Sequence, residues 1–430
     1  MFESADRTAD ARRSSLASSA RRMARDALLR SGATRRSALR RIAGALAGFG
    51  DAVPFEQRTR VVLVAPPGGG NIGDQAMVEA FLDNVGGDVT VVASSERAFS
   101  FTGVHAEQAD VVVLPGLLYG TVDDRRRDLA RFARLLADAR WVVVLGADTM
   151  DGHYQPRASV MRAVVAEAAV RAGASSRILG FSWSEEPRGA ARSSLRAARR
   201  AGVQILPRDP VSAERLRADG IAPTRTVADV VFAATGVDRA ARDELGLTGP
   251  YAVVNVSGGI ARRADLVADY AVVVRRLRDL GLRVVVLPHV VGTAVDDRAV
   301  SEALRRAVPE GVAVVERALA PAEVRGLVDG AEIVVTGRMH LAVMALPFAT
   351  PAVVLASQGK VEGLMALAGT PEMCVRPRVG LGADVVRLVE AALPAGSPAR
   401  ASIAAAVPVL RGMAADGFRG LPARADGGAS

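Results

Sequence analysis

The regular alternation of short apolar runs with helix-length segments constrains the fold of this 430-residue chain more than any other feature. From residue 60 onward, runs rich in Val, Ile and Leu recur with enough chain between them for a helix. Such continuously apolar strands are typical of a parallel sheet that helices cover on both faces. In the first half of the chain the runs are RVVLVAPP, DVTVVAS, ADVVVLPG, RWVVVLGA, SRILGFSW and VQILPRD.

A polar segment at 238–250, DRAARDELGLTGP, interrupts this pattern and ends in Gly-Pro, which favours a domain boundary. The alternation then restarts with YAVVNVS, LRVVVLPH, GVAVVE, AEIVVTGRMH and PAVVLAS. We therefore predict an α/β protein with two doubly wound, Rossmann-like domains that face a cleft. The expected domains span 58–240 and 241–395, and a C-terminal helix and flexible tail follow over 396–430.

Positive charge is concentrated at the N-terminus. The net charge is +9, and residues 1–50 hold eleven arginines against four acidic residues. We predict that residues 1–57 form a basic arm, either disordered or folded as an amphipathic helix on an anionic membrane surface. No basic patch with interleaved aromatic residues marks the rest of the chain, which argues against nucleic acid as a partner.

Cysteine content and hydropathy exclude further classes of protein. A single cysteine, Cys374, rules out an intramolecular disulfide and a cysteine-based metal cluster. No uncharged apolar run reaches 18 residues, so we predict no transmembrane helix. The N-terminus also lacks the apolar core of a signal peptide. We therefore expect a cytoplasmic protein, with peripheral contact at the inner face of the membrane through the basic arm.

Ligands of doubly wound folds bind outside the carboxyl ends of the strands, so the residues after each strand are the candidates for function. The first strand is followed by GGGNIGDQ, which matches the dinucleotide-binding spacing G-x-G-x-x-G with Gly70 at its centre. Glu96 lies at about the distance of a ribose-binding acid, so a dinucleotide site is one interpretation. Asn71 and Asp74 could instead hydrogen-bond a polyhydroxyl ligand, or Asp74 could cap the following helix.

Two further strand ends carry charged residues. GADTMDGHY places Asp148, Asp151 and His153 together, but their spacing matches no strong metal motif, so we expect no metal. A polar cleft wall or a helix-capping loop are the other interpretations of this segment. After the strand VQILP, Arg208 could clamp a carboxylate or phosphate, or could pair with its neighbour Asp209.

The second half places basic residues at its strand ends. His289 follows LRVVVLP, and Arg338 and His340 lie at a strand-to-helix turn whose amides favour an anion. Lys360, the only lysine of the chain, follows the adjacent strand, where a compact ammonium would act as a point charge. Arg, His and Lys at one sheet edge indicate an anionic substrate and a proton to be moved. The alternative is a basic surface rim with no role in binding.

Four segments together resemble the polysaccharide pyruvyl transferase family over about residues 60–370. They occur in the family's order, and they are GGGNIGDQAM, RDPVSAERLRADGI with VADVVF, LPH with DD downstream, and GRMHLAVMAL…TPAVVLASQGKVEGLM. The resemblance implies a GT-B-like fold and transfer of pyruvate from phosphoenolpyruvate to sugar hydroxyls as a ketal. The first domain would bind the acceptor and the second the donor, with neither metal nor organic cofactor.

The resemblance also implies roles for single residues. It places phosphoenolpyruvate-binding residues at Arg208, Arg338, His340 and Lys360. Since the reaction needs a general acid–base group, we predict His340 for it, with Asp74 or Asp148 as the base toward the acceptor. Further substrate-binding residues are expected at Asn71, Gly70, His289 and His153.

Three other functions remain open on the sequence. A nucleotide-sugar glycosyltransferase would share the architecture, and a dinucleotide-dependent oxidoreductase would use the glycine loop. A non-catalytic binding protein would keep only part of the site. The expected partners are phosphoenolpyruvate and a carbohydrate acceptor, either free or attached to a lipid carrier.

Overall fold

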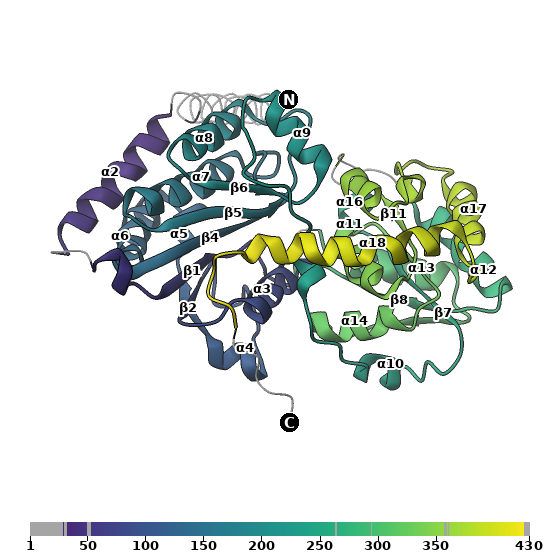
Figure 1. Ribbon diagram of the computed structural model, residues 1–430. Coiled ribbons are helices and arrows are strands. Elements are labelled where there is room, and N and C mark those ends of the chain that lie inside the picture. The colour runs from purple at the N-terminus through teal and green to yellow at the C-terminus, as the bar shows by residue number, and fades with distance from the viewer. Residues whose placement is uncertain are drawn as a thin grey trace, which may run out of the picture.

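Two parallel six-stranded sheets, each flanked by helices, build the two halves of the molecule (Figure 1). The computed structural model describes residues 29, 32–49, 53–262, 265–293, 295–356, 359 and 361–424. The predicted α/β class with two Rossmann-like domains is confirmed.

The first sheet has the strand order β3-β2-β1-β4-β5-β6, and all of its strand pairs are parallel. Its strands are β1 Arg60–Val64, β2 Val89–Ala93, β3 Ala109–Val113, β4 Ala139–Ala147, β5 Ser175–Phe181 and β6 Gln204–Pro207. Its helices are α3 Ile72–Asn84, α4 Gly103–Gln108, α5 Pro115–Leu118, α6 Val122–Asp138, α7 Pro156–Arg171, α8 Gly189–Arg200 and α9 Pro210–Ala218. Strand β2 is buried at every position, as a run without polar alternation predicts.

The second sheet repeats this topology in the order β12-β11-β10-β7-β8-β9. Its strands are β7 Tyr251–Asn255, β8 Arg283–Val286, β9 Val312–Val314, β10 Ile333–Thr336, β11 Ala352–Leu355 and β12 Cys374–Val375. Its helices are α10 Ala240–Glu244, α11 Gly258–Ala261, α12 Val267–Asp279, α13 Arg298–Ala307, α14 Pro321–Asp329, α15 Met339–Ala345, α16 Val361–Leu367 and α17 Gly382–Ala392. In each sheet the strand order reverses at one point, between β1 and β4 and between β7 and β10, where such folds bind ligands.

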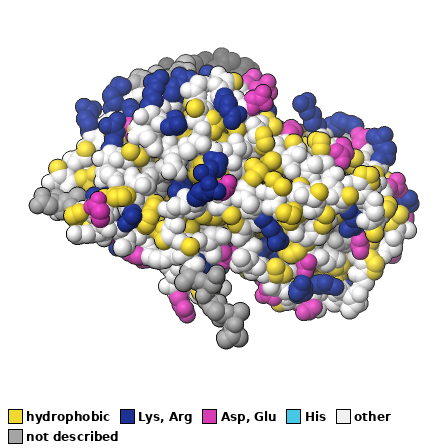
Figure 2. Space-filling model, in the orientation of Figure 1, with side chains coloured by type: hydrophobic (Ala, Val, Ile, Leu, Met, Phe, Trp, Pro, Cys, Tyr) yellow, Lys and Arg dark blue, Asp and Glu magenta, His cyan; other side chains and the backbone are white. Residues whose placement is uncertain are grey.

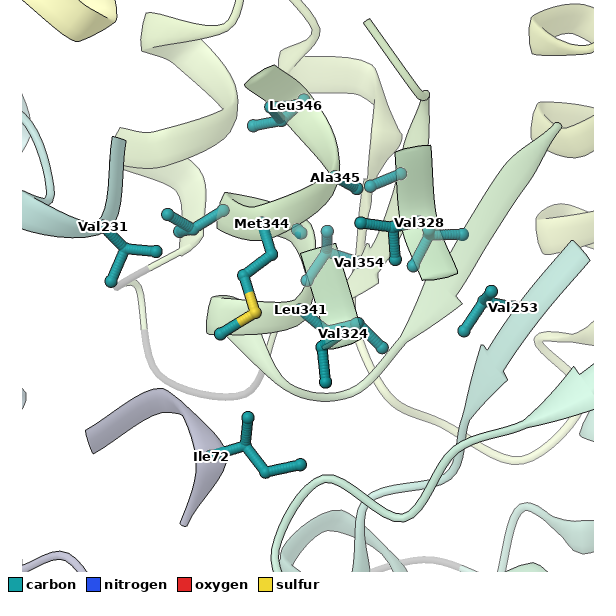
Figure 3. Close-up of a cluster of buried hydrophobic side chains, with 14 of the residues drawn as sticks. Ile72, Val231, Val253, Val324, Val328, Leu341, Met344, Ala345, Leu346 and Val354 are labelled. Carbon is teal, nitrogen blue, oxygen red and sulfur yellow. The ribbon is translucent and has the colours of Figure 1, made fainter. Parts of the chain in front are cut away.

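Apolar side chains join the two halves. One buried cluster extends from the first sheet through α3 and the short 3-10 helix η2 (Val230–Ala233) into the second sheet. Figure 3 shows Val231 of η2 to the left of Met344 of α15 and Ile72 of α3 below it. The domains therefore share a hydrophobic interface directly beside the strand ends.

The C-terminal helix α18 (Pro398–Ala415) lies across both halves of the molecule (Figure 1). Beyond it, the guanidinium of Arg177 on β5 donates hydrogen bonds to the carbonyls of Gly417 and Arg419, at 2.8 and 3.1 Å. Ala423 pairs with Val85 in an antiparallel bridge. Residues up to 424 are thus tied back to the first domain.

Helix α2 (Ala33–Ala47) is the described part of the predicted basic arm. It packs on α6 and α7, with Ala38 and Ile42 buried in the contact. Arg35 forms a bidentate salt bridge with the buried carboxylate of Glu167 on α7. The distance between Arg35 Nε and Glu167 Oε2 is 2.7 Å. Residues 1–28 of the arm lie outside the described residues. Among the described helices, none has both the length and the apolar character to cross a membrane.

Candidate active site

A cavity of about 240 Å³ lies between the two domains. It is bounded by residues that follow the switch-point strands of both sheets, where each parallel sheet exposes its carboxyl edge. Its polar lining consists of Asn71, Asp74, Asp148, Tyr154, Arg208, Ser257, His289, Arg338 and His340. The two halves of the chain therefore contribute to a single site.

Seven of the ten predicted site residues line this cavity. They are Asn71, Asp74, Asp148, Arg208, His289, Arg338 and His340. His153 is exposed and is not among the lining residues, although its neighbour Tyr154 is. Lys360 lies outside the described residues, so its contact with a substrate stays a prediction.

Gly70, another predicted binding residue, contacts the opposite domain and is not part of the cavity lining. Its carbonyl accepts a hydrogen bond from the backbone amide of Val291 at 2.9 Å. A Cβ atom at this position would lie 1.9 Å from the Val291 carbonyl oxygen, and the φ angle is +84°. Only glycine fits both the left-handed backbone and this close approach.

The glycine loop is engaged by the chain itself. The carboxylate of Asp74 accepts a hydrogen bond from the amide of Gly68 at 2.9 Å, and the amide of Ile72 donates to the carbonyl of His289 at 3.2 Å. The cap of α3 is Asn71, whose side chain accepts from the amide of Gly73, so the interpretation of Asp74 as the cap was wrong. In a dinucleotide-binding protein the same loop would bind the pyrophosphate, whereas here its backbone groups form these hydrogen bonds within the protein.

Asp74 carries a buried carboxyl group whose pKa is raised. It is 6% exposed. Burial raises the pKa of Asp74 to about 6, with His340 opposing and Asp148 reinforcing the shift. A carboxyl with such a pKa can both give and take a proton near pH 6.

Tyr154 extends the polar wall at the mouth of the cavity. The residue is 56% exposed, but its hydroxyl hydrogen-bonds Asp148. The pKa of the Tyr154 hydroxyl is raised, first by the charge of Asp148 and then by burial of the hydroxyl end. Tyr154 is not among the site residues predicted from the sequence, although it is the last residue of the segment GADTMDGHY.

Arg208 is held by a buried carboxylate. Its Nη1 lies 2.8 Å from Oδ2 of Asp229, and its Nε donates to Ser182 Oγ at 2.9 Å. Asp209, the partner that its position suggested, instead accepts from Ser212 and caps α9, so that pairing was wrong. Asp229 also contacts the imidazole of His340.

The Asp229–His340 contact connects the domains. Oδ2 of Asp229 lies 3.5 Å from His340 Nε2. Burial alone would raise the pKa of Asp229, but His340 and Arg208 outweigh it and hold this pKa below its usual range. The imidazole also lies against α3, since a Cβ atom on Gly73 would be 2.4 Å from His340 Nδ1. His340 is thus positioned from both domains.

Arg338 pairs with a second buried carboxylate, Asp297. Arg338 Nη2 is 2.6 Å from Oδ1, and its Nε is 3.3 Å from Oδ2. Asp297 is fully buried and also accepts from the amides of Gly258 and His289. This carboxylate fixes three segments of the second domain at once. Its only sequence signal was the pair of aspartates downstream of LPH.

The buried pairs exclude the interpretation of a basic surface rim. The side chains of Arg208 and Arg338 are 4% and 19% exposed, and each is paired with an aspartate that is almost fully buried. Two arginines held in this way are preorganised donors for an anionic ligand. Within the described part of the chain, no group of three His, Cys, Asp or Glu side chains is placed to hold a metal ion.

Comparison with known proteins connects this geometry to a family. A sequence profile described as "Polysaccharide pyruvyl transferase" matches residues 71–359. That range includes the polar residues of the cavity lining and both buried arginine–aspartate pairs.

The chain is also similar in fold to solved structures of low sequence identity. UGT89C1 of Arabidopsis thaliana, complexed with UDP-L-rhamnose, aligns over 84% of this chain and 97% of its own, with 11% identity and a TM-score of 0.52. MnaA of S. aureus, in a structure with UDP, aligns over 83% and 94%, with 12% identity and a TM-score of 0.51. UDP-GlcNAc 2-epimerase of Neisseria meningitidis, bound to UDP-GlcNAc, aligns over 83% and 97%, with 12% identity and a TM-score of 0.50. At these identities the likeness shows the fold alone, which is the GT-B arrangement of two domains.

Proposed function

The chain belongs to the polysaccharide pyruvyl transferase family, and we propose that this transferase moves pyruvate from phosphoenolpyruvate to two hydroxyls of a sugar, forming a ketal. The observation that carries the proposal is that buried aspartates hold two arginines, Arg208 and Arg338, in the cleft that also contains His340. Asp74, which lines the same cavity, supplies a carboxyl group whose pKa is raised to about 6 by burial.

The donor site is formed by the second domain together with Arg208. Phosphoenolpyruvate carries a carboxylate and a phosphate, so two fixed guanidinium groups suit its two anionic ends. Hydrogen bonds to charged groups contribute about 1.5–3 kcal/mol each. We include Lys360 as a further cation for the donor phosphate or carboxylate, on the strength of its position in the family motif.

The proposed reaction begins with transfer of a proton to the donor. His340, whose Nε2 lies 3.5 Å from Oδ2 of Asp229, gives a proton to the methylene carbon of phosphoenolpyruvate, and positive charge develops at the neighbouring carbon. A sugar hydroxyl attacks that carbon while Asp74 or Asp148 accepts the hydroxyl proton. A second hydroxyl then displaces phosphate, and its proton leaves with the phosphate. The methylene has become the methyl group of the ketal.

Titration of phosphoenolpyruvate into the protein by calorimetry tests the donor. We expect saturable binding to the wild type, weakened on the order of 10- to 100-fold in Arg338→Ala because a charge-assisted contact is lost. His340→Ala should keep most of the binding and lose transfer. A wild type that ignores phosphoenolpyruvate but binds a UDP-sugar would overturn the proposal in favour of a nucleotide-sugar glycosyltransferase, and binding of NAD(P) would favour an oxidoreductase.

For the acceptor, we propose a sugar on a lipid carrier at an anionic membrane, which the protein meets through its basic N-terminal region. Arg40 and Arg41 on α2 are exposed. Figure 2 shows basic side chains gathered over the part of the molecule where Figure 1 places α2 and α8. Arginines attract anionic lipid headgroups at about 1 kcal/mol each.

Vesicle sedimentation tests this contact. We expect the full chain to bind vesicles containing phosphatidylglycerol, and the double variant Arg40→Ser/Arg41→Ser to bind less. Vesicles of phosphatidylcholine alone are the control. Equal sedimentation of wild type and variant with the anionic vesicles would contradict a role for α2.

A further inference from the structure

The side chain of His289 is buried at the cavity. The residue is 1% exposed, and neither ring nitrogen has a hydrogen-bond partner among the described residues. Its backbone, in contrast, is fixed from both domains. The amide donates to Asp297 at 3.1 Å, and the carbonyl accepts from the amide of Ile72 at 3.2 Å.

This arrangement is unfavourable in the free protein. Nearly all buried polar groups in proteins have partners, and one that lacks a partner lowers stability. Here two such atoms belong to one ring. The ionisable side chains that act electrostatically on the ring are those of His340 and Arg338, and a cation offers no acceptor to an imidazole N–H. A packing role alone would be filled better by an apolar side chain of the same size.

The ring is also uncharged. Burial lowers the pKa of His289 well below its usual value, and the positive charges of His340 and Arg338 lower it further. A neutral imidazole has one N–H donor and one acceptor nitrogen. It can therefore hold an anion by a directed hydrogen bond without adding a third positive charge next to two others.

We propose that His289 is a binding residue whose imidazole donates a hydrogen bond to an anionic oxygen of the donor substrate in the cavity. The inference rests on the proposed function for the identity of that donor, phosphoenolpyruvate. It separates the roles of the two histidines in the site. His340 moves a proton, while His289 orients the substrate and remains neutral.

The stability of the free protein gives the first test. His289→Leu replaces the ring by an apolar side chain of similar volume, so it removes both unpartnered nitrogens. We expect a higher Tm than that of the wild type in a thermal shift experiment without ligand. A histidine with a structural role would give the opposite sign, so a fall of several degrees would overturn the inference.

Calorimetric titration with phosphoenolpyruvate gives the second test. His289→Leu should bind on the order of 10- to 100-fold more weakly than the wild type, since it loses a hydrogen bond to a charged group. His289→Gln keeps a donor and an acceptor and should recover most of the affinity. Equal binding by wild type and His289→Leu would refute the role of His289 while leaving the proposed function intact.

The two proposals fail in distinguishable ways. If the wild type does not bind phosphoenolpyruvate, the proposed function is wrong, and UDP-glucose is titrated into the same three proteins. Weaker binding of that probe by His289→Leu would keep His289 as an uncharged binding residue for another anionic ligand, whereas equal binding would overturn it. If neither probe binds the wild type, the Tm of His289→Leu is the remaining test. A higher Tm than that of the wild type would support the inference, and a lower one would overturn it.

Discussion

Replacement of Asp74 by asparagine should stabilise the protein at neutral pH. Burial raises the pKa of this carboxyl from 3.8 to about 6, so the folded state prefers the protonated, uncharged form. Asparagine is uncharged at every pH and its amide oxygen can still accept from the amide of Gly68, as Asp74 does. The variant therefore removes the cost of a buried charge and keeps the loop contact.

The expected gain in the free energy of unfolding follows from the pKa shift of Asp74. A displacement of about two pKa units corresponds to about 3 kcal/mol at roughly 1.4 kcal/mol per unit. Because the folded-state pKa lies above the unfolded one, the contribution of Asp74 to stability is largest below pH 4 and is lost as the pH rises through 6. We expect Asp74→Asn to match the wild type at pH 4 and to exceed it by up to about 3 kcal/mol at pH 8.

Urea unfolding followed by tryptophan fluorescence suits this measurement. Both tryptophans, Trp141 on β4 and Trp183 after β5, lie in the same domain as Asp74. A difference between variant and wild type that is the same at pH 4 and pH 8 would refute the reasoning. So would a variant that is the less stable of the two at pH 8.

Two other substitutions test the setting of His340. Gly73→Ala would place a methyl group 2.4 Å from His340 Nδ1; we expect transfer to fall on the order of 100-fold as the imidazole shifts, with far-UV circular dichroism unchanged. Asp229→Asn leaves Arg208 buried without its anionic partner, so the free energy of unfolding at pH 7 should fall by about 3–5 kcal/mol, measured in urea. Since the pKa of Asp229 lies below its usual value of 3.8, this loss should stay constant above that value and shrink as the pH falls below it.

Gly73→Ala and Asp74→Asn each have a matched control. For Gly73→Ala it is Gly189→Ala at the start of α8, where an added Cβ meets nothing within 4 Å and transfer should be unchanged. For the pH-dependent stability of Asp74→Asn, the control is Asp83→Asn. Burial would raise the pKa of Asp83, but its hydrogen bond to His105 and the amide of Thr235 lower it. Asp83→Asn should therefore be less stable than the wild type at pH 8, which is opposite in sign to Asp74→Asn.

The fold could be predicted because strand burial leaves a local signal. Residues 61–64, VVLV, are apolar and buried at every position, as in a strand inside a parallel sheet that helices cover on both faces, so the pattern indicates the sheet type. The end of each strand then identifies a candidate for the site without further information. Position after a strand predicts Asn71, Arg208 and Arg338 as site residues, and all three line the cavity.

The partners of these residues could not be predicted in the same way. Asp229 lies 21 residues beyond Arg208, and Asp297 lies 41 residues before Arg338. Which aspartate pairs with which arginine depends on how loops from separate strands meet, and no periodicity encodes that. Two buried carboxylates that fix the site were therefore identified only from the structure.

The backbone of the glycine loop is hydrogen-bonded to the opposite domain. If the domains swing apart, the hydrogen bonds from Ile72 to His289 and from Val291 to Gly70 break. His340 then also loses its neighbour Gly73. His340, the acid of the proposed reaction, is therefore positioned only while the two domains are in contact, so we expect separation of the domains to suppress proton transfer.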